Sequence, residues 1–209
     1  SSATIDSAKR LLAPYKINFE SNPRIRQFYG SQVTLGQWTD GEFTAKCGAK
    51  FVALGAGSAP RGARNEEVRP DVIYMDDYDT DEDCRNPETL KKKWDWFEAS
   101  LYPTRSISEP TLILWCGNII AKDCCIKKAG AKARHWDIVN IRDKDGHSTW
   151  PAKNTEEQID TVLSNISTKS AQAEYFNNPV SEGTIFKYLP FGKVPPLKKF
   201  KFLIAYGDP

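Results

Sequence analysis

The chain carries the run Arg69-Pro70-Asp71-Val72-Ile73-Tyr74-Met75-Asp76-Asp77-Tyr78-Asp79. In this run the segment from Val72 to Met75 is apolar, has no helical period and leads directly into two carboxylates. The pattern predicts a buried parallel strand, because a strand covered on both faces needs no polar alternation. Ligand sites of open α/β sheets lie outside the carboxyl ends of the strands. Asp76 and Asp77 are therefore expected at a binding edge.

The acid pair has the form of a Walker B motif. One carboxylate at a strand end can hold a hydrated Mg²⁺, and its neighbour can orient an attacking water, as nucleotide hydrolysis requires. Acid pairs also follow short apolar runs for purely structural reasons. The alternative interpretation is a strand that ends in a polar turn or a helix cap.

The composition is that of an ordinary globular protein. The 209 residues are 40% hydrophobic and 27% charged, with a formal net charge of +2, which excludes wholesale disorder and fits one large domain or one domain and part of another. The chain has five cysteines, none in CxxC spacing, and two histidines, so few residues are available to bind zinc. Reduced thiols in a cytosolic setting are expected. No apolar run approaches the roughly 20 residues of a membrane span, and no membrane partner is expected.

Three elements are expected before this strand. Residues 1–19 have apolar positions at helical spacing and predict a helix. Asn22-Pro23 is a start signal for a second, short helix, in which Phe28 would face inward. Residues 33–54 contain short runs of alternating polar and apolar residues, broken at Asp-Gly and Cys-Gly, which predicts a small antiparallel unit.

The segment after the strand predicts a βαβ unit. A helix is expected to start at Asn86-Pro87, with an apolar stripe at Leu90, Trp94, Phe97 and Leu101. Residues 111–115 form a second apolar run with strand propensity. Strands joined by a crossover helix are parallel, so Asn118 should emerge at the same edge as the acid pair. There it could sense a terminal phosphate or cap the next helix.

Further elements are expected toward the end of the chain. Residues 135–141 predict a strand, Thr155 to Gln158 form a capping box that opens a helix, and residues 171–178 continue in helical structure. A last strand, residues 200–206, leads to Asp208. Residues 183–207 contain five lysines and no acid, as in a solvated linker or, alternatively, a nucleic-acid surface.

A glycine-rich loop, residues 55–64, precedes the acid strand. It lacks the GxxxxGK[ST] arrangement and contains no lysine, so it is not a P-loop. Arg61 and Arg64 on this loop could reach a phosphate, since guanidinium binds phosphate bidentately. The alternative is a surface loop with solvated arginines.

The order of these features resembles the large terminase subunit of tailed bacteriophages, the motor that packages viral DNA. The match covers roughly residues 1–186 and rests on Asn22-Pro23-Arg24-Ile25, Gly55-Ala56-Gly57, Arg61-Gly62-Ala63-Arg64, residues 69–77, Trp150-Pro151, residues 173–180 and Gly183-Thr184-Ile185-Phe186. The resemblance implies an α/β fold in two parts. Residues 1–180 would be the C-terminal part of a P-loop ATPase domain of the RecA/ASCE-like type, a partial parallel sheet with flanking helices. Residues 181–209 would be a linker and the first strand of a ribonuclease H-like nuclease domain.

The resemblance also implies roles for the acid edge. Asp76 would be the Walker B acid linked to Mg²⁺, and Asp77 would polarise the attacking water, although glutamate is more usual there. Gly117 and Asn118 would contact the nucleotide within the coupling motif that links hydrolysis to movement, where threonine is common at the position of Asn118.

Two further roles follow from the same resemblance. Arg61 or Arg64 would serve as an arginine finger that reaches the nucleotide of a neighbouring subunit. Asp208 would be the first metal-binding aspartate of the nuclease, whose chemistry needs further carboxylates.

The activity implied is ATP-driven translocation of double-stranded DNA into a procapsid, with Mg²⁺ and ATP as cofactors and cleavage of concatemeric DNA. The partners implied are the portal, the small terminase subunit and further copies in a homo-oligomeric ring, in the host cytoplasm; alone, the chain could be a monomer. Because it resembles a segment that begins just after the P-loop, it is expected to hydrolyse little or no ATP by itself. The alternative is a non-enzymatic assembly or interaction module on an ATPase-like scaffold. A third reading, a stand-alone metal-dependent nuclease, rests on Asp208 alone.

Overall fold

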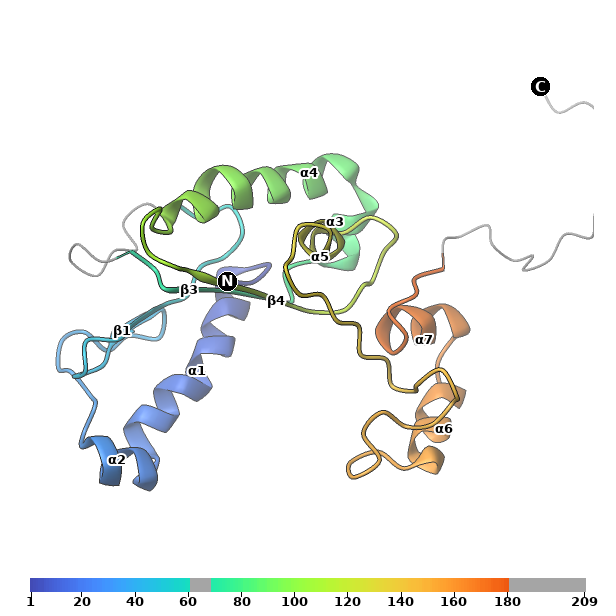
Figure 1. The fold of residues 1–209 in the computed structure, drawn as a ribbon, viewed down its shortest axis with the longest axis horizontal. Helices are drawn as coiled ribbons and strands as arrows, with labels where there is room; N and C mark the ends of the chain where they lie inside the picture. The colour runs from blue at the N-terminus through green and yellow to red at the C-terminus, as the bar shows by residue number, and fades with distance from the viewer. Residues whose placement is uncertain (61–68, 181–209) are drawn as a thin grey trace, which may run out of the picture.

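The computed structural model describes residues 1–60 and 69–180, which form a mixed α/β structure with two small sheets (Figure 1). The elements are α1 (Ile5–Ser21), α2 (Pro23–Tyr29), β1 (Glu42–Thr44), β2 (Lys50–Val52), β3 (Val72–Asp76), α3 (Asp81–Arg85), α4 (Pro87–Trp96), η1 (Phe97–Leu101), η2 (Tyr102–Thr104), β4 (Leu112–Cys116), α5 (Cys125–Gly130), α6 (Glu156–Ser164) and α7 (Thr168–Glu174). The predicted α/β class is confirmed. Within the described ranges, no helix is both long and apolar enough to cross a membrane.

The predicted βαβ unit is present. Strands β3 and β4 pair in parallel, with Ile73 opposite Ile113 and Asp76 opposite Cys116. Helix α4 forms the crossover between them and lies along one face of the pair (Figure 1). The carboxyl ends of both strands therefore meet at one edge, as expected for parallel neighbours.

The main core lies between α4 and the β3–β4 pair. Each of the four stripe residues is buried, at 3 to 8% exposure: Leu90, Trp94, Phe97 and Leu101. They pack in one cluster with Ile73 and Met75 of β3, whose side chains point to the same face because residues i and i+2 of a strand share a side. The stripe read from the sequence is thus confirmed as core.

The other face of the β3–β4 pair departs from the prediction of a strand buried on both sides. Val72 and Leu112 each keep 54% of their surface exposed, and Leu114 keeps 40%. In the part of the chain that the structure describes, this face is largely open. An apolar run indicates that both faces of a strand are suited to burial, but it does not indicate whether a second layer of structure covers them.

The N-terminal elements form a smaller aromatic cluster. Strands β1 and β2 are antiparallel, which confirms the antiparallel unit predicted within residues 33–54. Phe43 of β1 is fully buried and stacks on Phe51 of β2 at 4.7 Å between ring centroids. Phe19 of α1 and Trp38 contact Phe43 at 6.1 and 4.6 Å. These aromatic contacts fix the hairpin against the C-terminal half of α1.

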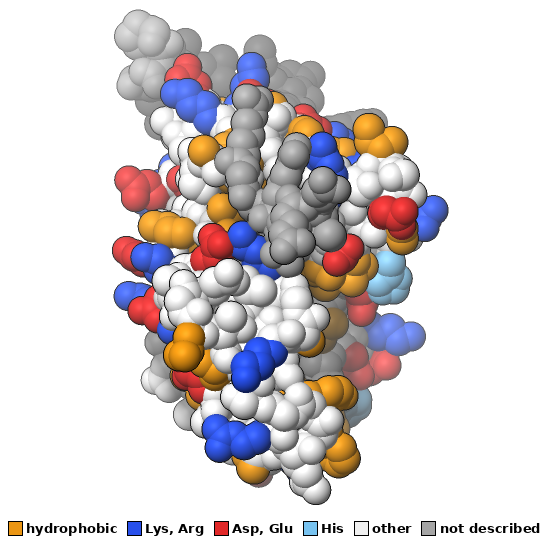
Figure 2. Space-filling model, turned by 90° about the vertical axis from the view of Figure 1, so that its left-hand side faces the viewer, with side chains coloured by type: hydrophobic (Ala, Val, Ile, Leu, Met, Phe, Trp, Pro, Cys, Tyr) orange, Lys and Arg blue, Asp and Glu red, His pale blue; other side chains and the backbone are white. Residues whose placement is uncertain are grey.

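Helix α2 begins where the sequence predicts. The Asn22 side chain accepts a hydrogen bond from the backbone of Arg24, and Gly30 follows the last helical residue with a φ of 71°. Phe28, however, is 73% exposed, so its predicted inward orientation is wrong. The helix lies at the end of the molecule, where no described element covers it. On this side of the molecule, hydrophobic side chains are dispersed among basic and acidic ones (Figure 2).

The strand predicted at residues 135–141 does not form. Residues 135–140 belong to no strand and pair with none in the described ranges, and Trp136 instead places its ring on Gly130, where a Cβ atom would meet it at 2.6 Å. A β-prone segment needs a partner to satisfy its backbone groups, and none lies beside it here. Residues 143–146 form a turn, closed by a bridge between Arg142 and Ser148.

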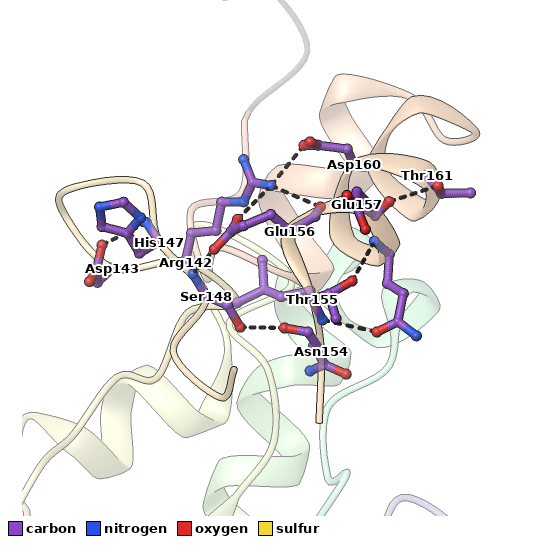
Figure 3. A network of polar contacts seen from close by, with 12 residues as sticks. Arg142, Asp143, His147, Ser148, Asn154, Thr155, Glu156, Glu157, Asp160 and Thr161 are labelled. Atoms are coloured by element: carbon purple, nitrogen blue, oxygen red, sulfur yellow. Dashed lines mark hydrogen bonds and ion pairs between the residues drawn. The ribbon is translucent and has the colours of Figure 1, made fainter. Parts of the chain in front are cut away.

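A polar network joins this turn to α6 (Figure 3). Arg142 Nη2 lies 3.0 Å from Glu156 Oε2 and 2.7 Å from Asp160 Oδ1. The Ser148 backbone donates to Glu156 Oε1 at 2.6 Å. Thr155 and Gln158 form the predicted capping box. The network makes residues 140–148 and the start of α6 one unit, so a displacement of either is passed to the other.

A buried ion pair links α3 to α4. Lys93 is 8% exposed; its Nζ lies 2.6 Å from Asp83 Oδ2 and also donates to the Tyr78 carbonyl. Burial raises the pKa of Asp83, but hydrogen bonds from Lys93 and Thr80 and the charge of Lys93 outweigh burial and lower the pKa below its usual value. A lowered native pKa stabilises the fold above the unfolded value of about 4, and this contribution is lost as the pH falls below it.

We therefore expect Asp83→Asn to lower the free energy of unfolding by about 2 kcal/mol at pH 7 and by less at pH 3. The loss is below the roughly 3–5 kcal/mol of a fully buried pair because Asp83 stays partly exposed, at 22%. Urea unfolding at several pH values measures it, with Asp95→Asn, an exposed site on the same helix as Lys93, as the control. Equal losses at pH 7 and pH 3 would contradict the linkage to Asp83.

Candidate functional site

The sequence-predicted residues of the acid edge are brought together. Asp76 stands opposite Cys116 in the β3–β4 register, and the Asp77 backbone donates to the Cys116 carbonyl at 3.3 Å. Gly117 and Asn118 follow directly, so the acid pair and the Gly-Asn pair leave adjacent parallel strands at the same edge. This juxtaposition of residues about 40 positions apart is the central feature of the site.

A cavity of about 380 Å³ opens at this edge. Its walls come from the loop after β3, the end of β4, the start of α5 and the end of α7, and comprise residues 77–81, 115–118, 120, 126 and 174. The volume falls in the range of about 300–1,000 Å³ that is usual for small-molecule sites. Asp77 and Asn118 both line the cavity, whereas Asp76 does not.

The two carboxylates have different surroundings. Asp76 Oδ2 accepts a hydrogen bond from the Tyr74 hydroxyl at 3.3 Å. Asp77 has a φ of 44°, a left-handed conformation that aspartate tolerates better than most residues, and it belongs to the cavity wall. Such backbone outliers are concentrated at functional sites. The turn at Asp77 separates the two acids, so one can hold an ion while the other faces the cavity.

Tyr74 is a site residue that sequence reasoning missed. A hydrogen bond with Cys116, burial and the charge of Asp76 together raise the pKa of Tyr74 well above its usual value. The hydroxyl therefore stays protonated and donates to Asp76. The signal was present in the sequence, because residues i and i+2 of a strand share a face.

Asn118 does not cap the next helix, which excludes that interpretation. The N-terminus of α5 is capped by Asp79, whose two carboxylate oxygens accept from the backbones of Cys125 and Ile126 at 3.0 and 2.9 Å. Asn118 instead donates through Nδ2 to the carbonyl and to Oε2 of Glu174, at 3.1 and 3.2 Å. Since both partners are acceptors, the amide nitrogen faces Glu174 and the Oδ1 atom is turned away from it.

Gly117 meets a backbone requirement. Its φ of 146° lies in a region that L-residues rarely adopt, while a Cβ atom there would make only ordinary contacts, at 3.6 Å to Ile126 and 3.8 Å to Asp77. Glycine is needed at this position for conformation rather than for space.

The donor set fits one mode of metal binding and not another. No group of three His, Cys, Asp or Glu side chains that could enclose a metal ion is found in residues 1–60 and 69–180. Mg²⁺ commonly keeps several waters and takes one or two carboxylates together with substrate phosphates. Asp76 and Asp77 suit that open, hydrated mode.

Three predicted site residues, Arg61, Arg64 and Asp208, lie outside the described residues, as does the predicted strand at 200–206. The preceding part of the glycine-rich loop is described and is anchored beside the acid strand. The Trp96 indole donates to the Ser58 carbonyl at 2.7 Å, and Gly55 bridges to Ser2. The loop therefore starts beside Ser2 and is held by the C-terminal end of α4.

The cysteine thiols are all free, as predicted. Burial is the main cause that raises the pKa of Cys84, to about 12, and it also raises the pKa values of Cys124 and Cys125. These thiols stay protonated near neutral pH and are poor nucleophiles and poor metal ligands.

Comparisons of the chain with protein-family models, with curated proteins and with solved structures give no match. The function is therefore inferred from the residues of the edge and from the resemblance seen in the sequence.

Proposed function

We propose that the edge formed by Asp76, Asp77 and Asn118 binds Mg²⁺ and ATP and serves ATP hydrolysis in a viral DNA-packaging motor of the large terminase class. One observation carries the proposal: parallel strands β3 and β4 deliver the acid pair and the Gly-Asn pair to one edge, where Asp77 and Asn118 line a common cavity of about 380 Å³.

The two acids take different parts. Asp76, held by the Tyr74 hydroxyl, is the ligand for hydrated Mg²⁺. Asp77, turned into the cavity, accepts a hydrogen bond from the attacking water and orients it toward the terminal phosphate. When bound, Mg²⁺ neutralises charge that develops on the phosphate oxygens. Asn118 contacts the phosphate end of the nucleotide through the amide oxygen that Glu174 leaves free.

The finer fold proposed is a partial RecA/ASCE-like sheet. In the described residues β4 pairs only with β3, so its second edge is open to another parallel strand. On the far side of β3, the Asp76 backbone donates to the Ser1 carbonyl at 2.9 Å, so residues 1–3 run beside that strand. The order supports a sheet in which a strand bearing the phosphate loop would join at β4, next to the acid edge.

The remaining assignments rest on the resemblance. Double-stranded DNA, the procapsid portal, the small terminase subunit and a homo-oligomeric ring are the proposed partners, in the host cytoplasm. Arg61 or Arg64 is the proposed residue acting on a neighbouring subunit's nucleotide. Asp208 is the proposed first metal ligand of a ribonuclease H-like nuclease.

The test is ATP hydrolysis by protein expressed from the complete reading frame that contains this chain. Turnover should require Mg²⁺, and Asp76→Ala should reduce it to background because the ligand for the metal is lost. Wild-type turnover in Asp76→Ala, or turnover that persists in excess EDTA, would refute the proposal.

A second candidate, a non-enzymatic assembly module, is favoured by the open apolar face of β3–β4, where Val72 and Leu112 are both 54% exposed. That face could receive a partner. If the chain is such a module, Asp76→Ala should leave assembly unchanged, whereas Leu112→Lys should disrupt assembly. Retained assembly in Leu112→Lys would exclude this candidate.

A further inference from the structure

We propose that Glu174 and Asn177, at and just after the end of α7, form a latch that positions Asn118 and ties the acid edge to residues 139–141. The inference rests on the proposed nucleotide function of that edge and adds to it a route by which the edge is linked to the segment that carries α6 and α7. Glu174 and Asn177 act in it as positioning residues.

The first half of the latch holds the side chain of Asn118. Glu174 accepts from Asn118 Nδ2 with both its carbonyl and its carboxylate. Two acceptors fix the rotation of the amide, so Oδ1 is presented on the opposite side. Because Glu174 and Asn118 both line the cavity, the contact lies in the wall of the proposed nucleotide site.

The second half holds the backbone that follows. Asn177 Oδ1 accepts from the Ile119 backbone at 2.9 Å, while Asn177 Nδ2 donates to the Val139 carbonyl and to Asn140 Oδ1, both at 3.3 Å. One amide side chain thus bridges the exit of β4 and the segment before the Arg142 turn. Asn177 does not line the cavity.

The backbone of the latch is itself specialised. Asn177 has a φ of 49°; with Asp77, it is one of the two non-glycine residues with positive φ in the described ranges. Asparagine tolerates this conformation better than most residues do. The Ile141 backbone donates to the Tyr175 carbonyl at 2.9 Å, which adds a third link to the same short segment. The two outliers stand at the acid strand and at the latch, on the two sides of Asn118.

A mechanical consequence follows from these contacts. If Asn118 moves to meet a phosphate, it must carry Glu174 with it or break those hydrogen bonds, each worth about 1 kcal/mol net. Residues 139–141 are held by Asn177 and Tyr175 and are joined through Arg142 to α6. Movement at the edge is therefore passed to α6 and α7 through discrete bonds rather than through a broad packed surface.

Hydrogen exchange of single amides, measured by NMR on the full chain, tests the latch without nucleotide. Asn177→Gly keeps the positive φ and removes only the amide side chain, so the Ile119 amide should exchange about tenfold faster. Asn177→Asp keeps the acceptor for the Ile119 amide, so exchange of that amide should stay near the wild-type rate.

The half of the latch formed by Glu174 is tested in the same way. Glu174→Ala should increase exchange of the Asn118 side-chain amide, and Glu174→Gln, which keeps an acceptor, should return exchange to the wild-type rate. Glu109→Ala, an exposed acid in a distant loop, is the control.

The coupling is tested by adding Mg·ATP to protein expressed from the complete reading frame that contains this chain. In wild type we expect a change in exchange at Ile141; Asn177→Gly should bind Mg·ATP within about threefold of wild type and lose most of that change. Unchanged Ile119 exchange in Asn177→Gly, or a full response at Ile141 in that variant, overturns the latch. Failure of the proposed function gives a different result, because the wild-type protein itself would then bind no Mg·ATP. That result overturns the coupling. The measurements without nucleotide would still show whether the latch contacts exist.

Discussion

Asp77→Asn is expected to lower kcat for ATP hydrolysis about 10²- to 10⁴-fold, with KM changed less than about threefold. The substitution keeps the size of the side chain and its tolerance of a positive φ, which is 44° at this position. It removes the negative charge and the ability to accept a proton from the attacking water, while the amide oxygen can still accept a hydrogen bond. Steady-state kinetics on protein from the complete reading frame measure the effect.

Asp71→Asn provides the matched control. Asp71 stands just before β3, at the opposite end of the strand from Asp77, and is exposed. It carries the same charge but lies away from the cavity, so its loss should leave kcat within about twofold, in the range of ordinary surface substitutions. If the two variants lost activity equally, or if Asp77→Asn raised KM and spared kcat, Asp77 would be a binding residue and the assigned role would be wrong.

The comparison with Asp76 sharpens this prediction. Asp76 is outside the cavity wall and is bound to the Tyr74 hydroxyl, whereas Asp77 is within the wall. Removal of Asp76 should therefore weaken Mg²⁺ binding and abolish turnover, while removal of Asp77 should lower turnover and leave Mg²⁺ binding near that of wild type. Adjacent carboxylates with different environments are a common way to divide metal binding and proton transfer.

Local patterns predicted those parts of the fold that depend on local physics. The apolar run before Asp76 identifies a strand, and the stripe along α4 and η1 identifies a helical segment and its buried face, because strand and helix periods are read over a few residues. The βαβ rule then placed Asn118 beside the acid pair without any knowledge of contacts. These inferences concern one segment or two consecutive ones.

The errors concern neighbours. Among residues 1–60 and 69–180, residues 135–140 have strand propensity but no partner strand, Phe28 has helical spacing but no covering element, and the outer face of β3 is apolar yet open. In each case the sequence of the segment is compatible with burial, and what is missing is another surface. Propensity is a weak prior that tertiary context overrides.

The supporting residues of the site could not be predicted for the same reason. Asn118 and Glu174 are separated by 56 positions, and Ile119 and Asn177 by 58. No helical or strand period relates residues at such distances. No sequence pattern singled out Asp79, although its capping of α5 positions a wall of the cavity. Tyr74 alone had a local signal, its i, i+2 relation to Asp76.

Trp94→Ala is expected to destabilise the fold by about 3–5 kcal/mol, a large share of the roughly 5–15 kcal/mol typical of a domain. Trp94 is 8% exposed and contacts Phe97 and Trp115 at 5.4 and 6.0 Å between ring centroids. Its removal leaves a cavity between α4 and β4. Urea unfolding monitored by circular dichroism measures the loss, because the fluorescence of the chain changes with any tryptophan removed.

The same substitution should also loosen the acid edge. Trp115, which packs on Trp94, lines the cavity at the end of β4, so the register that places Gly117 and Asn118 beside Asp77 depends on this contact. Trp150→Ala is the control: that indole is 58% exposed, and its loss should cost less than about 1 kcal/mol. Equal losses in the free energy of unfolding in the two variants would show that the apolar stripe is not the core that holds the β3–β4 pair. The position of the acid edge could then not be attributed to that core.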